Sequence, residues 1–147
     1  MTSAAAFADL QRLVLAMPMA RTLGLRFLDA QPGAVELEMP VADAFSFRPG
    51  QLQATAVFAI ADFAAVSAAG TLLPAGWVNA TIDGAIKLVA PARGAALRAR
   101  GRVIDAGQLL TVCAADVFAI DADGHVTLCA TWLGTARNIA PARTTAT

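Results

Sequence analysis

The stretch AVFAIADFAAV, residues 56–66, places one carboxylate, Asp62, in the middle of an otherwise apolar run. The surrounding segment 52–73 has the length of a membrane span and contains only Gln53 and Asp62 as strongly polar residues. An Asp at the centre of a membrane helix costs about 2.5–3.5 kcal/mol, however, and Ala gains little from lipid. We therefore favour a helix buried on nearly every side by its own protein and keep a membrane span as the alternative.

The composition of the chain limits the classes of protein to which it can belong. Its 147 residues suit a single domain, residues 1–147, with one hydrophobic core. Acidic and basic residues balance at 11 each, so the positive field that gathers nucleic acid is missing and we expect no nucleic-acid partner. The N-terminus has no basic signal region, and Asp9 and Arg12 interrupt its apolar run, which predicts a cytoplasmic protein. Cys113 and Cys129 have no CxxC spacing and are expected to be buried free thiols.

The residues before the apolar run predict a short helix, two strands and a loop. A helix over 3–17, ended by Pro18 within an N-terminal helical segment 1–19, follows from apolar residues at helical spacing: Phe7, Leu10, Val14 and Met17. Residues 23–41, LGLRFLDAQPGAVELEMPV, are typical of a hairpin with one buried and one wet face, because apolar and acidic residues alternate after the QPGA turn. Residues 42–53 are expected to form a loop, because Pro49 and Gly50 interrupt regular structure.

After the apolar run, polar and apolar residues alternate with the two-residue period of a strand. The apolar helix is expected to continue to about Leu73 and to stop at PAG, residues 74–76. Residues 77–91 alternate polar and apolar side chains, as do residues 96–105, so each predicts a strand with one polar face. Two further strands are expected in QLLTVCAADVFAI (108–120) and HVTLCATWLGTA (125–136), joined by the turn DADG, with a flexible tail over 139–147.

This order of elements predicts an α+β fold, because runs of strands do not alternate one-to-one with helices. We expect an antiparallel sheet of about five to six strands wrapped around one long central helix, with a short helix at the N-terminus. Small Ala side chains let the helix and the sheet approach closely, so the apolar helix needs no membrane.

Four stretches of the chain carry a family resemblance. They are LGLRFLDAQPGAVELEMPV (23–41), FRPGQLQATAVFAIADFAA (47–65), VNATIDGAIKLVAPARG (78–94), and the segment 97–134, which begins with LRARGRVIDAG. Together they resemble the hotdog-fold thioesterases, specifically the phenylacetate-degradation (PaaI-like) acyl-CoA thioesterase group, over roughly residues 20–138. The resemblance implies a hotdog fold and the hydrolysis of an acyl-CoA thioester to free acid and coenzyme A.

The resemblance also implies a site. Members of the group carry a loop Asn, a His-Gly-Gly at the start of the central helix and an acid nine residues after that His. Asp62 falls on the acid, Gln53 on the His, Ala54 and Thr55 on the two glycines, and Phe47 on the Asn. The acid is retained, whereas its usual neighbours are not. The family's sites lie between subunits, which implies a homodimer or a dimer-of-dimers tetramer, and no metal or other cofactor is implied.

The chemistry of these positions is simple. A carboxylate prepares water for attack on a thioester or attacks it directly, and burial in an apolar cleft raises its pKa and makes it a better base. The first amides of the helix, near Ala54 and Thr55, can point at the thioester oxygen and stabilise the oxyanion. Gln53 replaces His as a donor in this hypothesis, and Gln53 and Thr55 alternatively only cap the helix.

Substrate contacts are expected from further polar residues. Ser67, Asn79 and Thr81 lie on the next helical turn or the facing strand and are candidates to replace the missing Asn. Lys87 and Arg93 are candidates to bind the phosphates of coenzyme A, together with a row of arginines at Arg98, Arg100 and Arg102. A solvated strand face explains that row as well, and we favour it.

Other reaction classes fit poorly. The single histidine, His125, follows a turn and is expected on the surface, so neither a His-dependent dehydratase nor a Ser-His-Asp hydrolase is indicated, and GxSxG is absent. Trp77 and Trp132 are expected to serve packing or subunit contact. The alternative to an enzyme is a non-catalytic acyl or acyl-CoA binding protein of the same fold, which Phe47 and Ala54 motivate.

Overall fold

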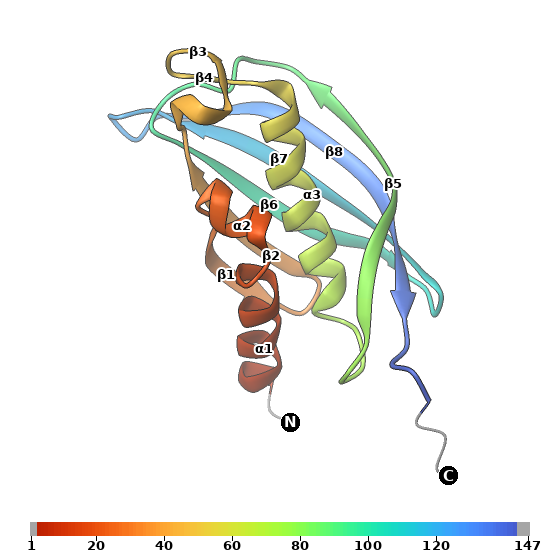
Figure 1. Cartoon of the computed structure of the whole chain (residues 1–147). Helices are drawn as coiled ribbons and strands as arrows, with labels where there is room; N and C mark the ends of the chain where they lie inside the picture. The colour runs from red at the N-terminus through yellow and green to blue at the C-terminus, as the bar shows by residue number, and fades with distance from the viewer. Residues whose placement is uncertain (1–2, 144–147) are drawn as a thin grey trace.

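A computed structural model describes residues 3–143 and shows a six-stranded antiparallel sheet curved around one long helix (Figure 1). The sheet order is β1-β2-β6-β7-β8-β5, and every neighbouring pair is antiparallel. The elements are α1 (Ser3–Leu15), α2 (Pro18–Leu23), β1 (Arg26–Gln31), β2 (Ala34–Pro40), η1 (Asp43–Phe45), β3 (Ser46–Arg48), β4 (Gln51–Leu52), α3 (Ala54–Gly70), β5 (Val78–Leu88), β6 (Ala96–Ala106), β7 (Leu110–Ile120) and β8 (Val126–Ile139).

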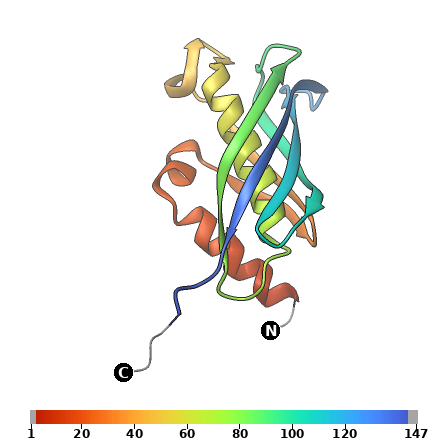
Figure 2. The same ribbon diagram turned by 90° about the vertical axis from the view of Figure 1, so that its right-hand side faces the viewer.

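The long helix α3 lies in the concave face of the sheet, as the view in Figure 2 also shows. Most of its alanines are buried, together with Val57 and Ile60. The approach is closest at β6, where a Cβ added to Gly101 would lie 2.0 Å from the carbonyl oxygen of Ala64. The expected α+β arrangement and the wrapped Ala-rich helix are therefore confirmed.

The helix at the N-terminus differs from the expectation. Helix α1 ends at Leu15, and Pro18 begins a second short helix, α2, instead of only ending the first. Proline is well tolerated at the first position of a helix, because its missing N–H would have no acceptor there. Gly24 then ends α2 in the left-handed conformation, with φ 70°.

Two boundaries around α3 also differ. Residues 42–53 are not a plain loop, because the 3-10 helix η1 and the small hairpin of β3 and β4 lie there, with Pro49 and Gly50 in the turn. Helix α3 ends at Gly70, three residues before the expected Leu73. The predicted tail begins at Ile139, the last residue of β8, and its residues 144–147 lie outside the described residues.

The first half of β5 carries the polar face predicted for residues 77–91, and this face lies toward α3. Asn79 and Thr81 face α3, whereas the apolar Val78 and Ile82 are exposed. The pairing of β5 with β8 shifts between Thr81 and Asp83, so the alternation does not continue through the strand. The alternation expected of β2 and β6 is confirmed, since their apolar residues face the core.

Two other expectations concern burial. Cys113 and Cys129 are buried free thiols, as predicted, and burial raises the pKa of each to about 11. No helix within residues 3–143 combines the length and the apolarity that crossing a membrane requires.

Candidate active site

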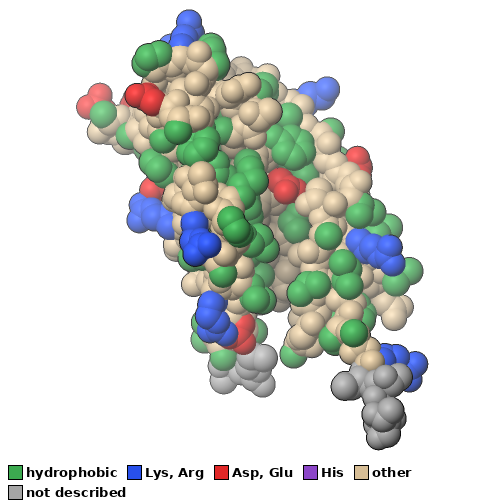
Figure 3. Space-filling view, viewed as in Figure 1, with side chains coloured by type: hydrophobic (Ala, Val, Ile, Leu, Met, Phe, Trp, Pro, Cys, Tyr) green, Lys and Arg blue, Asp and Glu red, His purple; other side chains and the backbone are tan. Residues whose placement is uncertain are grey.

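A cavity of about 300 Å³ lies between α1, α3 and β5 and contains Asp62 in its wall. Figure 3 shows this face of the molecule as a hollow flanked by hydrophobic side chains, with little charge in it. The lining residues are Leu10, Leu13, Val14 and Met17 from α1, Asp62, Phe63, Val66, Ser67 and Gly70 from α3, and Leu73, Trp77, Val78, Asn79, Ala80 and Thr81 from the turn and β5.

Asp62 is half-buried and has one hydrogen-bond donor among the described side chains. The Thr81 hydroxyl on β5 donates to Asp62 Oδ1 over 2.7 Å. Burial raises the pKa of Asp62 above its ordinary value, and the hydrogen bond from Thr81 opposes this by favouring the carboxylate. A carboxylate held in a largely apolar cavity with a raised pKa is suited to accept a proton near neutral pH.

Two more predicted residues lie in the same cavity. The Asn79 side-chain amide donates to the carbonyl oxygen of Val66 over 3.0 Å, which ties β5 to α3 one turn after Asp62. Ser67 is buried and lines the cavity. The structure therefore brings together Asp62, Ser67, Asn79 and Thr81.

The first turn of α3 lies apart from this group. Gln53, Ala54 and Thr55 are exposed, and no side-chain hydrogen bond caps the helix within the described residues, so the capping role considered for Gln53 and Thr55 is wrong. Asp62 follows Ala54 by eight residues, which corresponds to about 12 Å along the helix axis. One chain therefore does not bring its own helix amides to its own Asp62.

Phe47 lies in the β3–β4 hairpin at the end of the molecule where α3 begins (Figure 1). Its ring is 58% exposed, and the Arg48 guanidinium carbon lies 5.3 Å from the ring centroid. The start of α3 is tied to η1, directly before this hairpin, because the Gln53 amide donates to the carbonyl oxygen of Phe45 over 2.8 Å. Phe47 thus belongs with Gln53 and not with Asp62.

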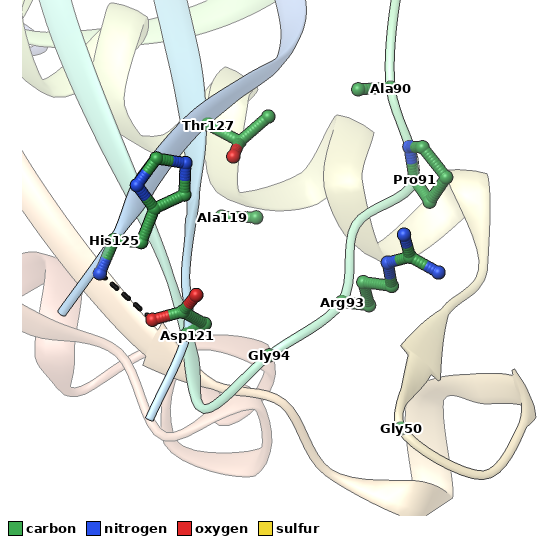
Figure 4. A pocket seen from close by; sticks show the side chains of 9 residues that line it. All are labelled: Gly50, Ala90, Pro91, Arg93, Gly94, Ala119, Asp121, His125 and Thr127. Atoms are coloured by element: carbon green, nitrogen blue, oxygen red, sulfur yellow. Dashed lines mark hydrogen bonds between the residues drawn. The ribbon is translucent and has the colours of Figure 1, made fainter. Parts of the chain in front are cut away.

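Arg93 lines a different cavity of about 590 Å³ (Figure 4). Figure 4 shows Arg93 on one side of this cavity and Asp121 and His125 on the other. Asp62 is not in its wall, so the acid predicted to act on the thioester does not face this larger space. His125 is exposed, as predicted, and its backbone amide donates to Asp121 Oδ1 over 2.8 Å. Lys87 is exposed on β5, paired in register with Thr131.

The arginine row on β6 is part of an outer face of charged pairs. Arg98 binds Glu38 at 2.8 Å, Arg100 lies 3.6 Å from Glu36, and Arg102 binds Asp116 at 3.0 Å. These contacts support the interpretation of a solvated strand face for the arginines.

Sequence reasoning missed the contribution of α1 to the cavity. Helical spacing identified Leu10, Val14 and Met17 as an apolar face but gave no role for that face. Val14 is buried, whereas Leu13 and Met17 remain largely exposed beside the hollow. Trp77 also lines the cavity, whereas Trp132 is buried against Phe58 with 5.9 Å between ring centroids.

Comparisons with known proteins place the chain among thioesterases. No protein-family model matches the sequence, and no curated protein does. A thioesterase family protein from Silicibacter pomeroyi is 31% identical, with a TM-score of 0.86 over 91% of this chain and 98% of that one. A thioesterase from Haemophilus influenzae is 20% identical, with a TM-score of 0.80 over 95% and 94%. The Escherichia coli PaaI protein of the phenylacetic acid degradation operon is 17% identical, with a TM-score of 0.81 over 96% and 98%.

Proposed function

Because the chain belongs to the hotdog-fold thioesterase superfamily and shares the fold of the PaaI protein, we propose that it is an acyl-CoA thioesterase. It hydrolyses the thioester to a free acid and coenzyme A. The observation that carries this proposal is Asp62, a half-buried carboxylate with a raised pKa in the wall of a largely apolar cavity. Such a group is poised to activate water beside an acyl chain.

The proposed reaction begins when the Asp62 carboxylate takes a proton from water as the water oxygen attacks the thioester carbon. The carbonyl oxygen becomes an oxyanion, and the tetrahedral intermediate then collapses with cleavage of the carbon–sulfur bond. The coenzyme A thiolate leaves and takes up a proton. Direct attack by Asp62 through an acyl anhydride is the alternative role of the same side chain. In either role the Thr81 hydroxyl holds Oδ1 of the carboxylate.

The oxyanion needs donors that the chain does not bring to its own Asp62. We assign this role to the Ala54 and Thr55 amides of a second copy, since about 12 Å of helix separates Ala54 from Asp62 within one chain. Gln53 and Phe47 then approach the thioester from that second copy as well. The site is complete only in a homodimer, or in a tetramer built from dimers.

Strand β5 supports the dimer. It is an edge of the six-stranded sheet and is 11 residues long, so its outer backbone groups are free to pair with another strand. Val78, Ile82 and Leu88 on this strand are more than half exposed. A long apolar edge of this kind is a surface that a second copy covers.

Coenzyme A is assigned to the end of the molecule where α3 begins. Arg93 lies next to the β3–β4 hairpin, because the Leu52 amide donates to the carbonyl oxygen of Ala92. Its cavity presents a guanidinium that suits a phosphate group, with Lys87 on β5 as a second cation. One subunit thus supplies Asp62, while its partner supplies the oxyanion amides and the phosphate contacts.

A second function is favoured by Phe47 and Ala54. Phe47 has no polar atom to hold water where the family carries Asn, and Ala54 replaces a glycine. A protein that binds acyl groups or acyl-CoA without hydrolysing them fits these two residues. A cytoplasmic location stays a prediction for either function.

Thiol release separates the two functions. Purified protein is mixed with short, medium, long and aryl acyl-CoAs, and free coenzyme A is measured with a thiol reagent. We expect turnover, and we expect Asp62→Asn to lower kcat by about 10²–10⁴-fold, the usual worth of a general base. The absence of turnover with all substrates would exclude the enzyme. An unchanged rate of Asp62→Asn would exclude the assigned acid.

A further inference from the structure

The cavity that holds Asp62 is elongated along α3. Its helix wall repeats every four residues, from Asp62 through Val66 to Gly70. The eight steps from Asp62 to Gly70 span about 12 Å at the rise of an α-helix. The cavity therefore has a direction, with the carboxylate at one end and Gly70 at the other.

The walls between these two ends are mostly apolar. Helix α1 contributes Leu10, Leu13 and Met17, and α3 contributes Phe63 and Val66. The polar side chains in the wall are Asp62, Ser67, Asn79 and Thr81. Of these, the Asn79 amide already donates to the Val66 carbonyl, and the Thr81 hydroxyl donates to Asp62. The space beyond Asp62 therefore favours hydrocarbon over a polar group.

The far end is closed by side chains that pack against Gly70, which has no side chain of its own. A Cβ added to Gly70 would lie 3.1 Å from Leu10 Cδ1 and 3.8 Å from Asn79 Nδ2. Leu73 and Trp77 complete this end. Gly70 and Leu10 together thus fix the depth of the cavity: any side chain at Gly70 shortens it, and a smaller one at Leu10 lengthens it.

We propose that this cavity selects acyl chains by length and fits a straight chain of about eight to ten carbons, with the thioester at Asp62 and the chain end at Gly70. The inference rests on the proposed function and specifies its substrate class. An extended chain advances roughly 1.2 Å per bond, as the peptide backbone does over its three bonds, so about 12 Å holds about ten bonds. The volume of about 300 Å³ agrees, since it holds roughly ten groups at the ~30 Å³ of a water molecule.

The dependence of kcat/KM on chain length follows from this geometry. Each methylene that enters the pocket adds up to about fourfold, the equivalent of about 0.8 kcal/mol per buried CH₂. The gain stops when the chain reaches Gly70 and Leu10. We expect the specificity constant to rise from four carbons, to reach its maximum at eight to ten, and to fall at longer lengths.

The test is a profile of kcat/KM over straight acyl-CoAs of four to sixteen carbons. Gly70→Ala and Gly70→Val are expected to move the optimum stepwise to shorter chains, and Leu10→Ala to longer ones. Leu15→Ala is the matched control, because Leu15 lies on the same helix and packs against the core outside this cavity. It is expected to leave the optimum unchanged. An optimum that neither Gly70 nor Leu10 moves would overturn the pocket, as would a preference for phenylacetyl-CoA over every straight chain.

A binding measurement tests the proposed pocket separately from the proposed thioesterase activity. Straight carboxylic acids of four to twelve carbons are titrated into the protein, and the fluorescence of Trp77 in the cavity wall is followed, with Trp77→Phe as the control for the buried Trp132. A length optimum that Gly70→Val shortens supports the pocket even if no thioester is hydrolysed, in which case the proposed enzyme alone fails. Hydrolysis without any length dependence of binding or turnover overturns the pocket alone.

Discussion

At the scale of single residues, the chemistry depends on the pair of Asp62 and Thr81. Their hydrogen bond joins the middle of α3 to the edge strand β5 and favours the charged form of the acid. Burial acts in the opposite direction and is the larger influence on the pKa. The balance of the two sets the pH range in which Asp62 is a base.

The first prediction concerns this balance. Thr81→Val removes the donor to the carboxylate, so the pKa of Asp62 rises further and the acidic limb of the kcat profile moves to higher pH. Thr81→Ser keeps a hydroxyl and is expected to retain the wild-type limb. The measurement is thiol release from one acyl-CoA between pH 4 and 9. Identical limbs for Thr81→Val and wild type would show that Thr81 does not set the ionisation of the base.

The second prediction concerns stability and has a fixed sign. The folded-state pKa of Asp62 is raised, so folding favours its protonated form. That contribution is full below the ordinary pKa of 3.8 and is lost as pH rises through the raised value. Asp62→Asn is therefore expected to unfold at a higher temperature than wild type at pH 7, with the difference disappearing towards pH 4.

Thermal unfolding across this pH range checks the second prediction. The control is Asp123→Asn in the exposed turn between β7 and β8, which is expected to leave the unfolding temperature unchanged. An Asp62→Asn variant that is less stable than wild type at pH 7 would contradict the idea that a charge is buried there for chemistry.

At the scale of elements, the position of Asp62 depends on how closely α3 approaches the sheet. The third prediction compares two single-methyl additions to this helix–sheet pair. Gly101→Ala places a Cβ where the Ala64 carbonyl lies, so it forces α3 away from β6 and is expected to cost about 1–3 kcal/mol or more, with loss of activity. Gly70→Ala is crowded only by the flexible end of the Leu10 side chain, because Asn79 Nδ2 at 3.8 Å is at an ordinary contact distance, and it adds a better helix former, so its stability is expected to be unchanged or higher.

Chemical denaturation of both variants measures the two costs side by side. Equal stabilities for Gly101→Ala and Gly70→Ala would show that the helix is free to shift on the sheet. A stable Gly70→Ala variant also ensures that a change in its chain-length preference reflects the cavity and not partial unfolding.

The elements that could be predicted from the sequence are those in which one physical effect dominates. The alternation in β2 and β6 follows from a core on one side and water on the other, and the Ala-rich α3 follows from burial on all sides. The alternation also predicted strand β5, but not which of its faces lies inward, because it is an edge strand whose inward Asn79 and Thr81 serve the cavity. Nothing local distinguishes such residues from a wet face.

At the scale of the whole molecule, the candidate site divides into a group of residues around Asp62 and a group at the start of α3. The sequence identified both groups through positions that match a family pattern, and it named Asp62, Ser67, Asn79 and Thr81, which the fold brings into one cavity. It could not show that α1 walls this cavity, because a helix face that packs and one that leaves a hollow have the same spacing. The rise of α3 separates Ala54 from Asp62 by about 12 Å within one chain, so the proposed site needs two chains.

A variant of Ala54 isolates the amide assigned to the oxyanion. Ala54 is the first residue of α3, where proline is favoured, and Gln53 before it has φ −69° and ψ 148°, as a residue preceding proline requires. Ala54→Pro therefore removes one N–H while the helix start keeps its backbone. Loss of one oxyanion donor is expected to lower kcat by about 10²–10³-fold, and Ala54→Ser, which retains the N–H, is the control.

The fourth prediction combines this variant with Asp62→Asn to test whether two subunits share a site. In a dimer that contains one subunit of each variant, one site joins an intact Asp62 to an intact Ala54 amide, while the other site has lost both. Random mixing makes half of the dimers mixed, so co-expressed or co-refolded variants are expected to recover about one quarter of wild-type activity. Each variant alone stays nearly inactive, since every one of its sites lacks a group. Thiol release from the mixture, with the mass of the assembly measured by light scattering, checks this. No recovery from dimers proven to be mixed would mean that each subunit completes its own site, because only then do both sites stay broken.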